Sequence, residues 1–390
     1  MTVRVNKSSF NIREKLSELG RKFGLKGSEL VAAETVQEAR DLVSAGRKNL
    51  IINGNMMISQ RYGFDSPQTV TNANGYYLDR FIIRENTDGA FQVRQSSPGY
   101  PFDNAMQIDV TTADTSMSAN QYTRIQYYVE GNDARAVDWG KSESKDHLTL
   151  SFWVKSNAPG DYHVSIENSN NNYYPLMVKK YTIEESDAWQ KVVVTFPPPG
   201  VYNFHRGEGV GLRITWSLSI GSSYNQATDG EWRTSGYQMS TSAQRNFMDT
   251  VGNNFYMTGV QLERGRNATD FEHRHYSEEL ALCQRYYGKI RLSNQEWIYN
   301  ESSSTWGKWW MGYIPFSMRV NPNIDSTDLT GGVSVSGLSG TVSTISPQTP
   351  GDTPGRVSMR VTMSTSSGTA RAIYHTDGWA GDYLAFDAEL

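Results

Sequence analysis

The residues whose chemistry points most clearly to a ligand are aromatic, and they lie close together towards the C-terminal end of this 390-residue chain. Asn, Glu and Ser residues are interleaved with them. Flat ring faces stack on sugar rings, while neighbouring amides and hydroxyls bind sugar hydroxyls. The pattern predicts a carbohydrate platform made of Trp297, Trp306, Trp309, Trp310 and Tyr313.

The same aromatic residues also suit a buried core or a subunit interface, where Trp and Tyr are enriched, and this alternative carries the greater weight. Trp309 and Trp310 are adjacent on an expected strand, so their side chains project to opposite faces of the sheet. Only one of these two indoles can therefore belong to a platform, while the other packs inward.

The sequence contains none of the common catalytic signatures: Gly-x-Ser-x-Gly, His-Glu-x-x-His and the phosphate loop are all absent. His273 and His275 alternate along an expected strand and could share a metal with Glu272 or Asp270 only if the strand bent. We therefore expect no catalytic residue, no cofactor, no metal and no enzymatic activity. A pair of carboxylates assembled from distant strands, as glycosidases use, stays open.

Composition narrows the possible partners. The net charge of -4 provides no basic field for a nucleic acid backbone, so we expect no nucleic acid partner. No apolar stretch is long enough to span a membrane, and the N-terminus lacks the apolar core of a signal peptide, so we expect neither membrane insertion nor export. The single cysteine, Cys283, excludes an intrachain disulfide, which suits folding in a reducing cytoplasm, and we expect this thiol to be buried.

Residues 1–46 differ from the rest because helical periodicity is concentrated there. Asn11 with Glu14, and Thr35 with Glu38, form the capping-box pattern that opens a helix. Two helices this short cannot form a core alone, so we expect them to dock elsewhere. Their apolar faces include Ile12, Leu16, Leu19, Val36, Leu42 and Val43.

From residue 47 onward, short apolar or alternating runs are separated by Asn, Gly, Ser and Pro clusters, with no intervening helical pattern. This arrangement predicts a mainly β protein with an antiparallel β-sandwich at 47–275 and a smaller C-terminal β domain at 276–390. The second domain is expected to open with a strand at 280–287. The expected strands of the sandwich include the runs 49–55, 76–83, 147–154, 189–196, 210–218 and 255–262.

Two pairs of polar residues are expected to hold the fold together rather than bind a ligand. Asp79 and Arg80 flank apolar strand positions and are expected to pair with each other or with backbone groups, which would fix a loop. Gln261 and Glu263 lie on one strand face before Gly265. We expect Glu263 to bind turn amides where the chain leaves the sandwich.

Several segments resemble a module of bacteriophage tail fibres and related virion proteins. They include Asn53-Gly54-Asn55 with Gln60-Arg61, Tyr77-Leu78-Asp79-Arg80-Phe81, where the family usually has Trp in place of Phe81, and Gly259-Val260-Gln261-Leu262-Glu263. The similarity continues through Cys283-Gln284-Arg285-Tyr286-Tyr287 and Phe316-Ser317-Met318-Arg319 to the closing Ala388-Glu389-Leu390. Residues 147–168 and 189–196 are similar to the jelly-roll of carbohydrate-binding modules. The N-terminal arm resembles attachment segments of marine and cyanobacterial phage proteins.

These resemblances imply a virion structural protein, assembled in the host bacterial cytoplasm as a homo-oligomer, with a trimer favoured. They imply a tail fibre or similar appendage that docks on other virion proteins by residues 1–46 and contacts polysaccharide on the host surface. Two alternatives stay open: a capsid decoration or head-fibre protein that needs no receptor, and a tail spike that degrades polysaccharide.

Deletion of residues 1–46 should leave a folded, soluble oligomer that no longer enters virions, because the deleted helices have an apolar face each and no partner within the segment. Quantitative blotting of purified particles measures incorporation. Truncated protein present at the normal copy number would show that the arm is not the docking element.

Overall fold

The structure is a computed structural model of the whole chain, which divides into two units, 1–49 and 50–390. The predicted docking residues Ile12, Leu16, Leu19, Val36, Leu42 and Val43 lie outside the described residues, so their role stays a prediction. The structure describes residues 48–135, 137, 139, 146–168, 175–291, 306–313, 316–320, 322–325, 333–335, 342–348, 356–363, 373–375 and 383–390.

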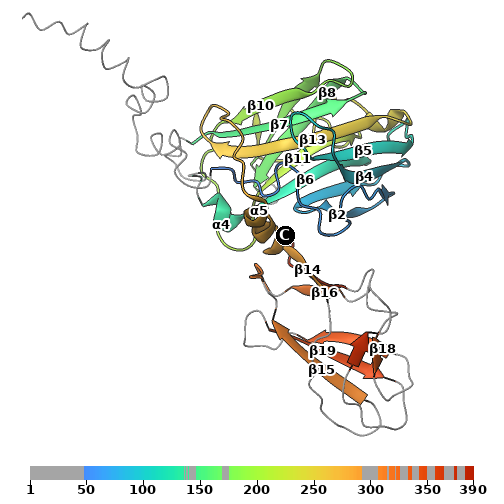
Figure 1. Cartoon of the computed structure of the whole chain (residues 1–390). Helices are drawn as coiled ribbons and strands as arrows, with labels where there is room; N and C mark the ends of the chain where they lie inside the picture. Colours follow the sequence, from blue (N-terminus) through green and yellow to red (C-terminus); the bar gives the residue numbers. More distant parts are fainter. Residues whose placement is uncertain are drawn as a thin grey trace, which may run out of the picture. The chain divides into compact units, whose positions relative to one another are not determined.

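Two antiparallel sheets pack face to face and confirm the predicted mainly β sandwich (Figure 1). One sheet has the order β1 (Gln68–Val70), β4 (Ala90–Ser96), β5 (Ala105–Thr112), β13 (Asn254–Arg264), β7 (Leu148–Ser156) and β10 (Gln190–Phe196). The other has the order β12 (Trp232–Arg233), β9 (Leu176–Ile183), β8 (Gly160–Asn168), β11 (Val210–Ile220), β6 (Tyr122–Glu130), β3 (Phe81–Glu85) and β2 (Asn74–Leu78). Two short helices accompany them, α4 (Gly131–Ala134) and η1 (Phe247–Asp249).

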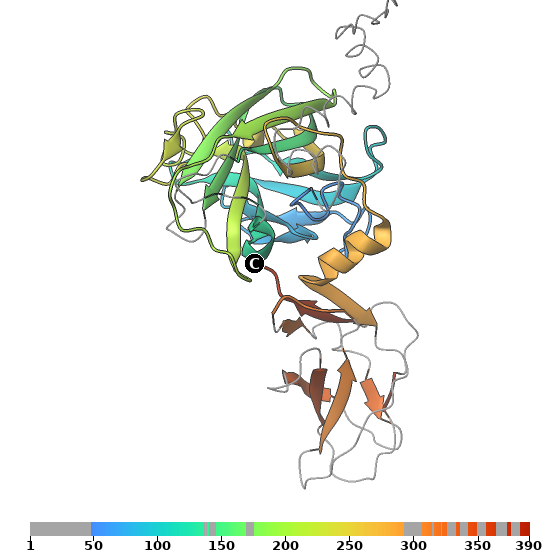
Figure 2. The same ribbon diagram turned by 90° about the vertical axis from the view of Figure 1, so that its left-hand side faces the viewer.

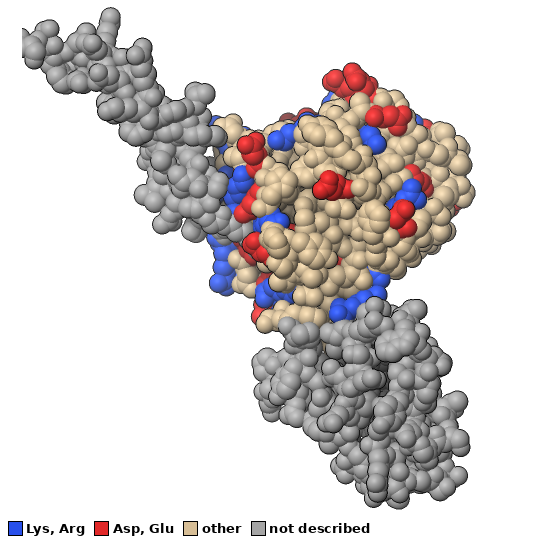
Figure 3. All heavy atoms as spheres, in the orientation of Figure 1, with Lys and Arg blue, Asp and Glu red and all other residues tan. Residues whose placement is uncertain are grey.

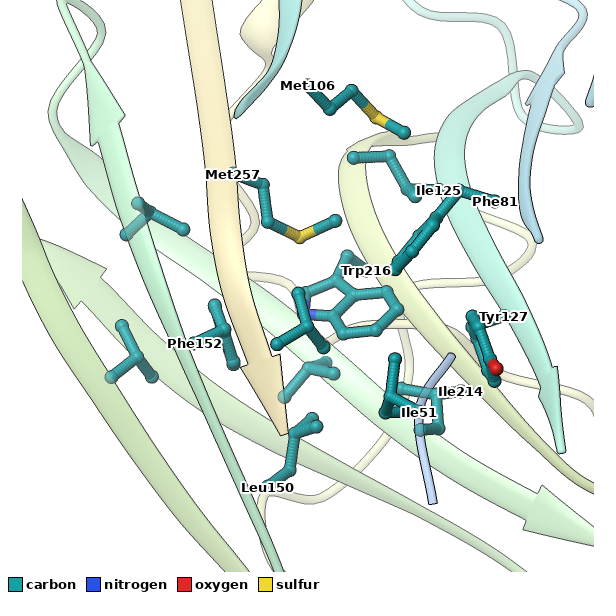
Figure 4. Close-up of a cluster of buried hydrophobic side chains, with 14 of the residues drawn as sticks. Ile51, Phe81, Met106, Ile125, Tyr127, Leu150, Phe152, Ile214, Trp216 and Met257 are labelled. Carbon is teal, nitrogen blue, oxygen red and sulfur yellow. The ribbon is translucent and has the colours of Figure 1, made fainter. Parts of the chain in front are cut away.

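The core between the sheets follows from the alternation of apolar residues along each strand. Figure 4 shows the indole of Trp216, from β11, among side chains of both sheets, with Met257 from β13 and Phe152 from β7 beside it. The rings of Phe152 and Trp216 meet edge to face with centroids 5.9 Å apart. Because the two inner faces interdigitate, the other face of each sheet is available for other contacts.

The described residues of the C-terminal part form one helix and three small groups of strands (Figure 2). None of the helices among the described residues is long and apolar enough to cross a membrane. The described residues give no test of the predicted division at 275/276. The elements are α5 (Tyr276–Gln284); a sheet of β14 (Tyr287–Arg291), β21 (Tyr383–Asp387) and β16 (Asn323–Asp325); a sheet of β15 (Trp306–Tyr313), β19 (Arg356–Met363) and β18 (Val342–Gln348); and the pair β17 (Val333–Val335) with β20 (Ile373–His375).

The strand predicted at 280–287 was wrong over most of its length, because α5 occupies the chain as far as Gln284. The imidazole of His275 accepts a hydrogen bond from the Ser277 amide and caps the helix, and acidic residues lie in its first turn. Cys283 faces inward from the helix and is fully buried, as expected, next to Ile52 and Ile58. The alternation of apolar residues at 280 and 282 suggested a strand, but the cap determines the structure here.

Two further predicted strands are also corrected. Residues 49–55 form no strand: Asn53 has a positive φ of 61°, and its side-chain amide bonds both the carbonyl and the amide of Ile58, which closes a loop. The run 76–83 is not one strand but a hairpin, in which β2 and β3 meet at Asp79 and Arg80. Arg80 has a φ of 72°, which permits the tight turn.

Arg80 is the centre of a buried polar network that joins the sandwich to the last residues of the chain. Its guanidinium forms an ion pair with Glu389 and donates to the carbonyl of Tyr128 at 2.7 Å. It also lies 3.4 Å from the centre of the Tyr286 ring. Arg80 therefore pairs with Glu389 and not with Asp79, and it holds together segments that are distant in sequence.

Asp79 takes part in the same network through Gln60. Its carboxylate accepts hydrogen bonds from the Gln60 amide and side chain, both at 2.6 Å, and the Gln60 side chain also donates to the carbonyl of Tyr287 at 2.7 Å. Burial raises the pKa of the Asp79 carboxyl, whereas Gln60 and Arg61 act to lower it. Arg61 lies 3.6 Å from the ring of Tyr287 and donates to Asp387 at 2.9 Å.

A third group attaches the end of α5 to the end of β6. Glu130 accepts hydrogen bonds from Arg285 and from the Tyr286 hydroxyl, both at 2.7 Å. Burial acts to raise the pKa of Glu130, but these donors hold it below its usual value. Arg319, in the Phe-Ser-Met-Arg segment, donates to the carbonyl of Ala388 at 3.0 Å. Several of the segments that carry the resemblance thus contact one another here.

Substituting Met for Arg80 should lower the free energy of unfolding by about 3 to 5 kcal/mol, because it leaves the buried Glu389 with only its longer ion pair to Arg61, at 3.4 Å. Urea unfolding monitored by circular dichroism provides the measurement. The matched control is Arg94→Met, which removes a partly exposed arginine whose ion pairs with Asp65 and Asp109 are 3.4 Å long and should cost under about 1 kcal/mol. Equal losses in the two variants would refute the central role of Arg80.

Candidate functional site

The outer face of the six-stranded sheet carries a hollow of about 220 Å³ over β7 and β13. Figure 1 shows these two strands side by side across the sandwich, and the residue register confirms that they are paired. The hollow combines aromatic rings with a few polar groups. Its lining is Tyr100, Pro101, Phe102, Ser151, Trp153, Lys191, Gly259, Asp270 and Phe271.

Strand alternation places the central residues of the hollow. Phe152 and Val154 of β7 are fully buried in the core, so Ser151 and Trp153 project to the opposite face. Lys191 of β10 lies directly opposite Trp153 in the register and is exposed. The edge of the sandwich therefore presents an indole and an ammonium group side by side.

Gly259 makes room for the aromatic wall. The register of β13 against β7 shifts between Thr258 and Gln261, and Gly259 within that shift has a positive φ of 60°. A Cβ atom on Gly259 would lie 2.5 Å from the ring of Phe102 and 3.0 Å from the indole of Trp153. The glycine of the Gly-Val-Gln-Leu-Glu motif is thus required for both rings to approach the sheet.

Tyr100 is the most exposed aromatic ring of the hollow. Its side chain is 82% exposed, and its ring meets that of Trp153 edge to face with centroids 6.3 Å apart. Behind it, the Phe102 and Phe271 rings pack edge to face at 5.0 Å. One wall is therefore rigidly packed, whereas Tyr100 and Trp153 offer ring surface to a ligand.

Charged groups on the described part of the face shown in Figure 3 do not form a single-sign field. On the face shown in Figure 3, positive and negative side chains are scattered over the described surface. Among the described residues, no group of three or more His, Cys, Asp or Glu side chains is arranged to hold a metal ion. His273 lies on no strand, contrary to expectation, and stacks on Phe102 with centroids 5.8 Å apart.

The predicted sugar platform is not brought together with this hollow by any described contact. Trp297 lies outside the described residues, and so do the side chains of the four residues on β15. The backbone of β15 pairs with β19, with Trp309 opposite Arg360 and Trp310 opposite Met359. The platform of Trp297, Trp306, Trp309, Trp310 and Tyr313 stays a prediction.

Gln261 and Glu263 lie at the edge of the hollow and bond the chain as it leaves β13. The Gln261 side chain donates to Glu263 at 2.8 Å. Glu263 in turn accepts from the Thr269 amide at 2.9 Å and from its hydroxyl at 2.7 Å. These bonds hold the segment that carries Asp270 and Phe271 against the sheet.

A second cluster of titratable groups lies on the outer face of the other sheet. The carboxylate of Glu167 is fully buried, 3.0 Å from the guanidinium of Arg213. Side chains of this face also bond the 221–246 segment: Arg124 donates to the Tyr237 hydroxyl at 2.8 Å. A buried acid with a perturbed pKa is a candidate for catalysis, but no solvent reaches Glu167, so its role here is structural.

No protein-family model matches the sequence, and no curated protein is significantly similar to it. Among solved structures, the chain is similar to tailspike protein 4 of bacteriophage CBA120, with 12% sequence identity and a TM-score of 0.29. The match covers 56% of this chain and 21% of the tailspike chain. The chain is also similar to a family 11 carbohydrate-binding module of Clostridium thermocellum, with 13% identity and a TM-score of 0.26. That match covers 53% of this chain and 98% of the module. A third similar structure is a putative sugar-binding protein of Bacteroides thetaiotaomicron, with 13% identity and a TM-score of 0.31. The match covers 56% of this chain and 100% of that protein.

Replacing Glu167 with Gln should change how stability depends on pH. Burial raises the pKa of Glu167 to about 7, although Arg213 acts to lower it. The unfolded chain ionises this carboxyl above about pH 4.5 and the folded chain only above about 7, so the wild type should lose about 3 to 4 kcal/mol between those values. The Gln variant lacks this contribution.

Urea unfolding of both proteins from pH 4 to 8 measures the effect. The free energy of unfolding of the variant minus that of the wild type should increase as pH rises, and then level off above about pH 7. Parallel pH profiles would show that Glu167 ionises normally in the fold.

Proposed function

We propose that this chain is a carbohydrate-binding component of a bacteriophage particle and that the hollow beside Trp153 is its glycan site. The observation that carries the proposal is the 82% exposed ring of Tyr100, which lies edge to face with Trp153 at the mouth of the hollow. Exposed ring surface beside polar groups is the arrangement that sugar rings require.

Polar groups around the rings supply the remaining chemistry. The hydroxyl of Ser151, the ammonium of Lys191 and the carboxylate of Asp270 line the hollow and are suited to bind sugar hydroxyls. Of the described lining residues, Asp270 alone carries a carboxylate, whereas glycosidases use two across a cleft. We therefore propose binding, and not hydrolysis, as the activity.

The particle role rests on the resemblance to fibre modules and on the contacts that bring several of those segments together around Arg80. In this proposal residues 1–46 dock on other virion proteins, the chain assembles as a homotrimer, and the sandwich contacts host surface polysaccharide. A capsid decoration protein would not need a glycan site, so glycan binding separates the two roles.

The test is glycan binding by Tyr100→Ala and Trp153→Ala, measured as Kd on the polysaccharide that the wild type binds best in a panel from host cell surfaces. Loss of one stacked ring should weaken binding by about 1 to 3 kcal/mol, or roughly 5- to 150-fold. Tyr100→Ala should keep its Tm within about 2 °C of the wild type, because the lost side chain is exposed.

Tyr276→Ala is the matched control, since it removes a 55% exposed ring of α5 that does not line the hollow. Its Kd should equal that of the wild type. The proposal fails if both pocket variants bind as tightly as the control, or if the wild type binds no surface polysaccharide.

A further inference from the structure

We propose that the glycan is an acidic polysaccharide and that its chain runs from the hollow onto a second aromatic site, formed by Trp189 and Tyr256 with Lys155 between them. This inference rests on the proposed function, because it extends the same binding face. It adds the ligand's charge, its minimum length and its direction across the sheet.

The second site lies one step along the outer face of the same sheet. Tyr256 of β13 is paired with Lys155 of β7, and Lys155 is two residues beyond Trp153 on the same side of that strand. Trp189 immediately precedes β10, and its ring meets that of Tyr256 at a centroid distance of 6.2 Å. All three side chains are partly exposed.

Spacing links this site to the hollow. Two residues along a strand correspond to roughly 7 Å, a distance that successive units of an extended sugar chain can span. When one sugar ring stacks on Trp153, the next part of the sugar chain therefore lies over Lys155 and Tyr256. The face has places for at least two sugar units in line.

The charge of the ligand follows from two ammonium groups. Lys155 lies 4.2 Å from the centre of the Tyr256 ring and 5.4 Å from that of Trp189, so both rings hold its position. Neither Lys155 nor Lys191 forms an ion pair with a carboxylate among the described residues. Two such groups on either side of Trp153 are complementary to an anionic sugar.

Two carboxylates near the second site have polar partners of their own. Asp109 accepts a hydrogen bond from the side-chain amide of Gln107 at 2.8 Å and forms an ion pair with Arg94 at 3.4 Å. Asp187 accepts from the Ser186 hydroxyl at 3.0 Å. Ammonium groups bind carboxylates and sulfate esters alike. We assign the ligand to polymers with carboxylates, the uronic acids, and leave sulfated polymers as a separate arm of the test.

The experiment measures Kd by calorimetry for the full chain with two uronate polymers, alginate and polygalacturonate. Each polymer is also tested after chemical reduction of its carboxyl groups, which makes its sugars neutral. A carrageenan, which carries sulfate but no carboxylate, is the third ligand. Wild type should bind at least one uronate polymer, and carboxyl reduction should weaken that binding about tenfold or more. The double variant Lys155→Gln, Lys191→Gln should bind both forms equally. Trp189→Ala should weaken binding of long chains more than binding of single sugars.

The matched control is Lys179→Gln, Lys180→Gln, which makes the same change in net charge on β9 of the other sheet and should leave every Kd unchanged. This inference is overturned if native and carboxyl-reduced polymers bind equally, or if carrageenan binds more tightly than either uronate polymer. It is also overturned if the Lys155, Lys191 double variant still distinguishes native from reduced polymer as the wild type does. If Trp153→Ala still weakens binding in those cases, the proposed function stands. If the wild type binds none of these polymers, acidic or neutral, this inference falls, and the host-surface panel alone decides the proposed function.

Discussion

The buried ion pair between Arg80 and Glu389 is the contact on which the rest of the fold depends. A buried charge is tolerated only when its partner and hydrogen bonds are in place, and Arg80 obtains them from Glu389, the Tyr128 carbonyl and the Tyr286 ring. These partners come from three distant parts of the chain. Closing the ion pair therefore requires β6, α5 and the last residues of the chain to be in position together.

The same part of the fold also contacts the binding face, through the backbone of Gly54. The Gly54 carbonyl accepts a hydrogen bond from Val260 at 2.8 Å, and a Cβ on Gly54 would lie 2.1 Å from the Val260 carbonyl oxygen. The next residue back along β13 is Gly259, beside which Phe102 and Trp153 pack. Motifs that resemble those of fibre modules thus shape the hollow without supplying its sugar-binding rings, which come from loops and from β7.

Alternation along strands was sufficient to predict the sandwich, because each strand buries one face. It could not distinguish a helix from a strand at 280–284, where apolar spacing fits both and the cap at His275 decides. The hollow was missed because it is assembled from separate segments, 100–102, 151–153, 191 and 270–271. The outward position of Trp153 in an alternating run was the available signal, but the denser aromatic segment near the C-terminus outweighed it.

The most direct test of the account is fluorine NMR of the chain labelled with 5-fluorotryptophan, titrated with the polysaccharide it binds. Each of the ten Trp residues gives one signal, which single substitutions assign. We expect the signals of Trp153 and Trp189 to shift with ligand, while that of the buried Trp216 does not. Shifts confined to Trp297, Trp306, Trp309 and Trp310 would contradict it and move the glycan site to the C-terminal segment.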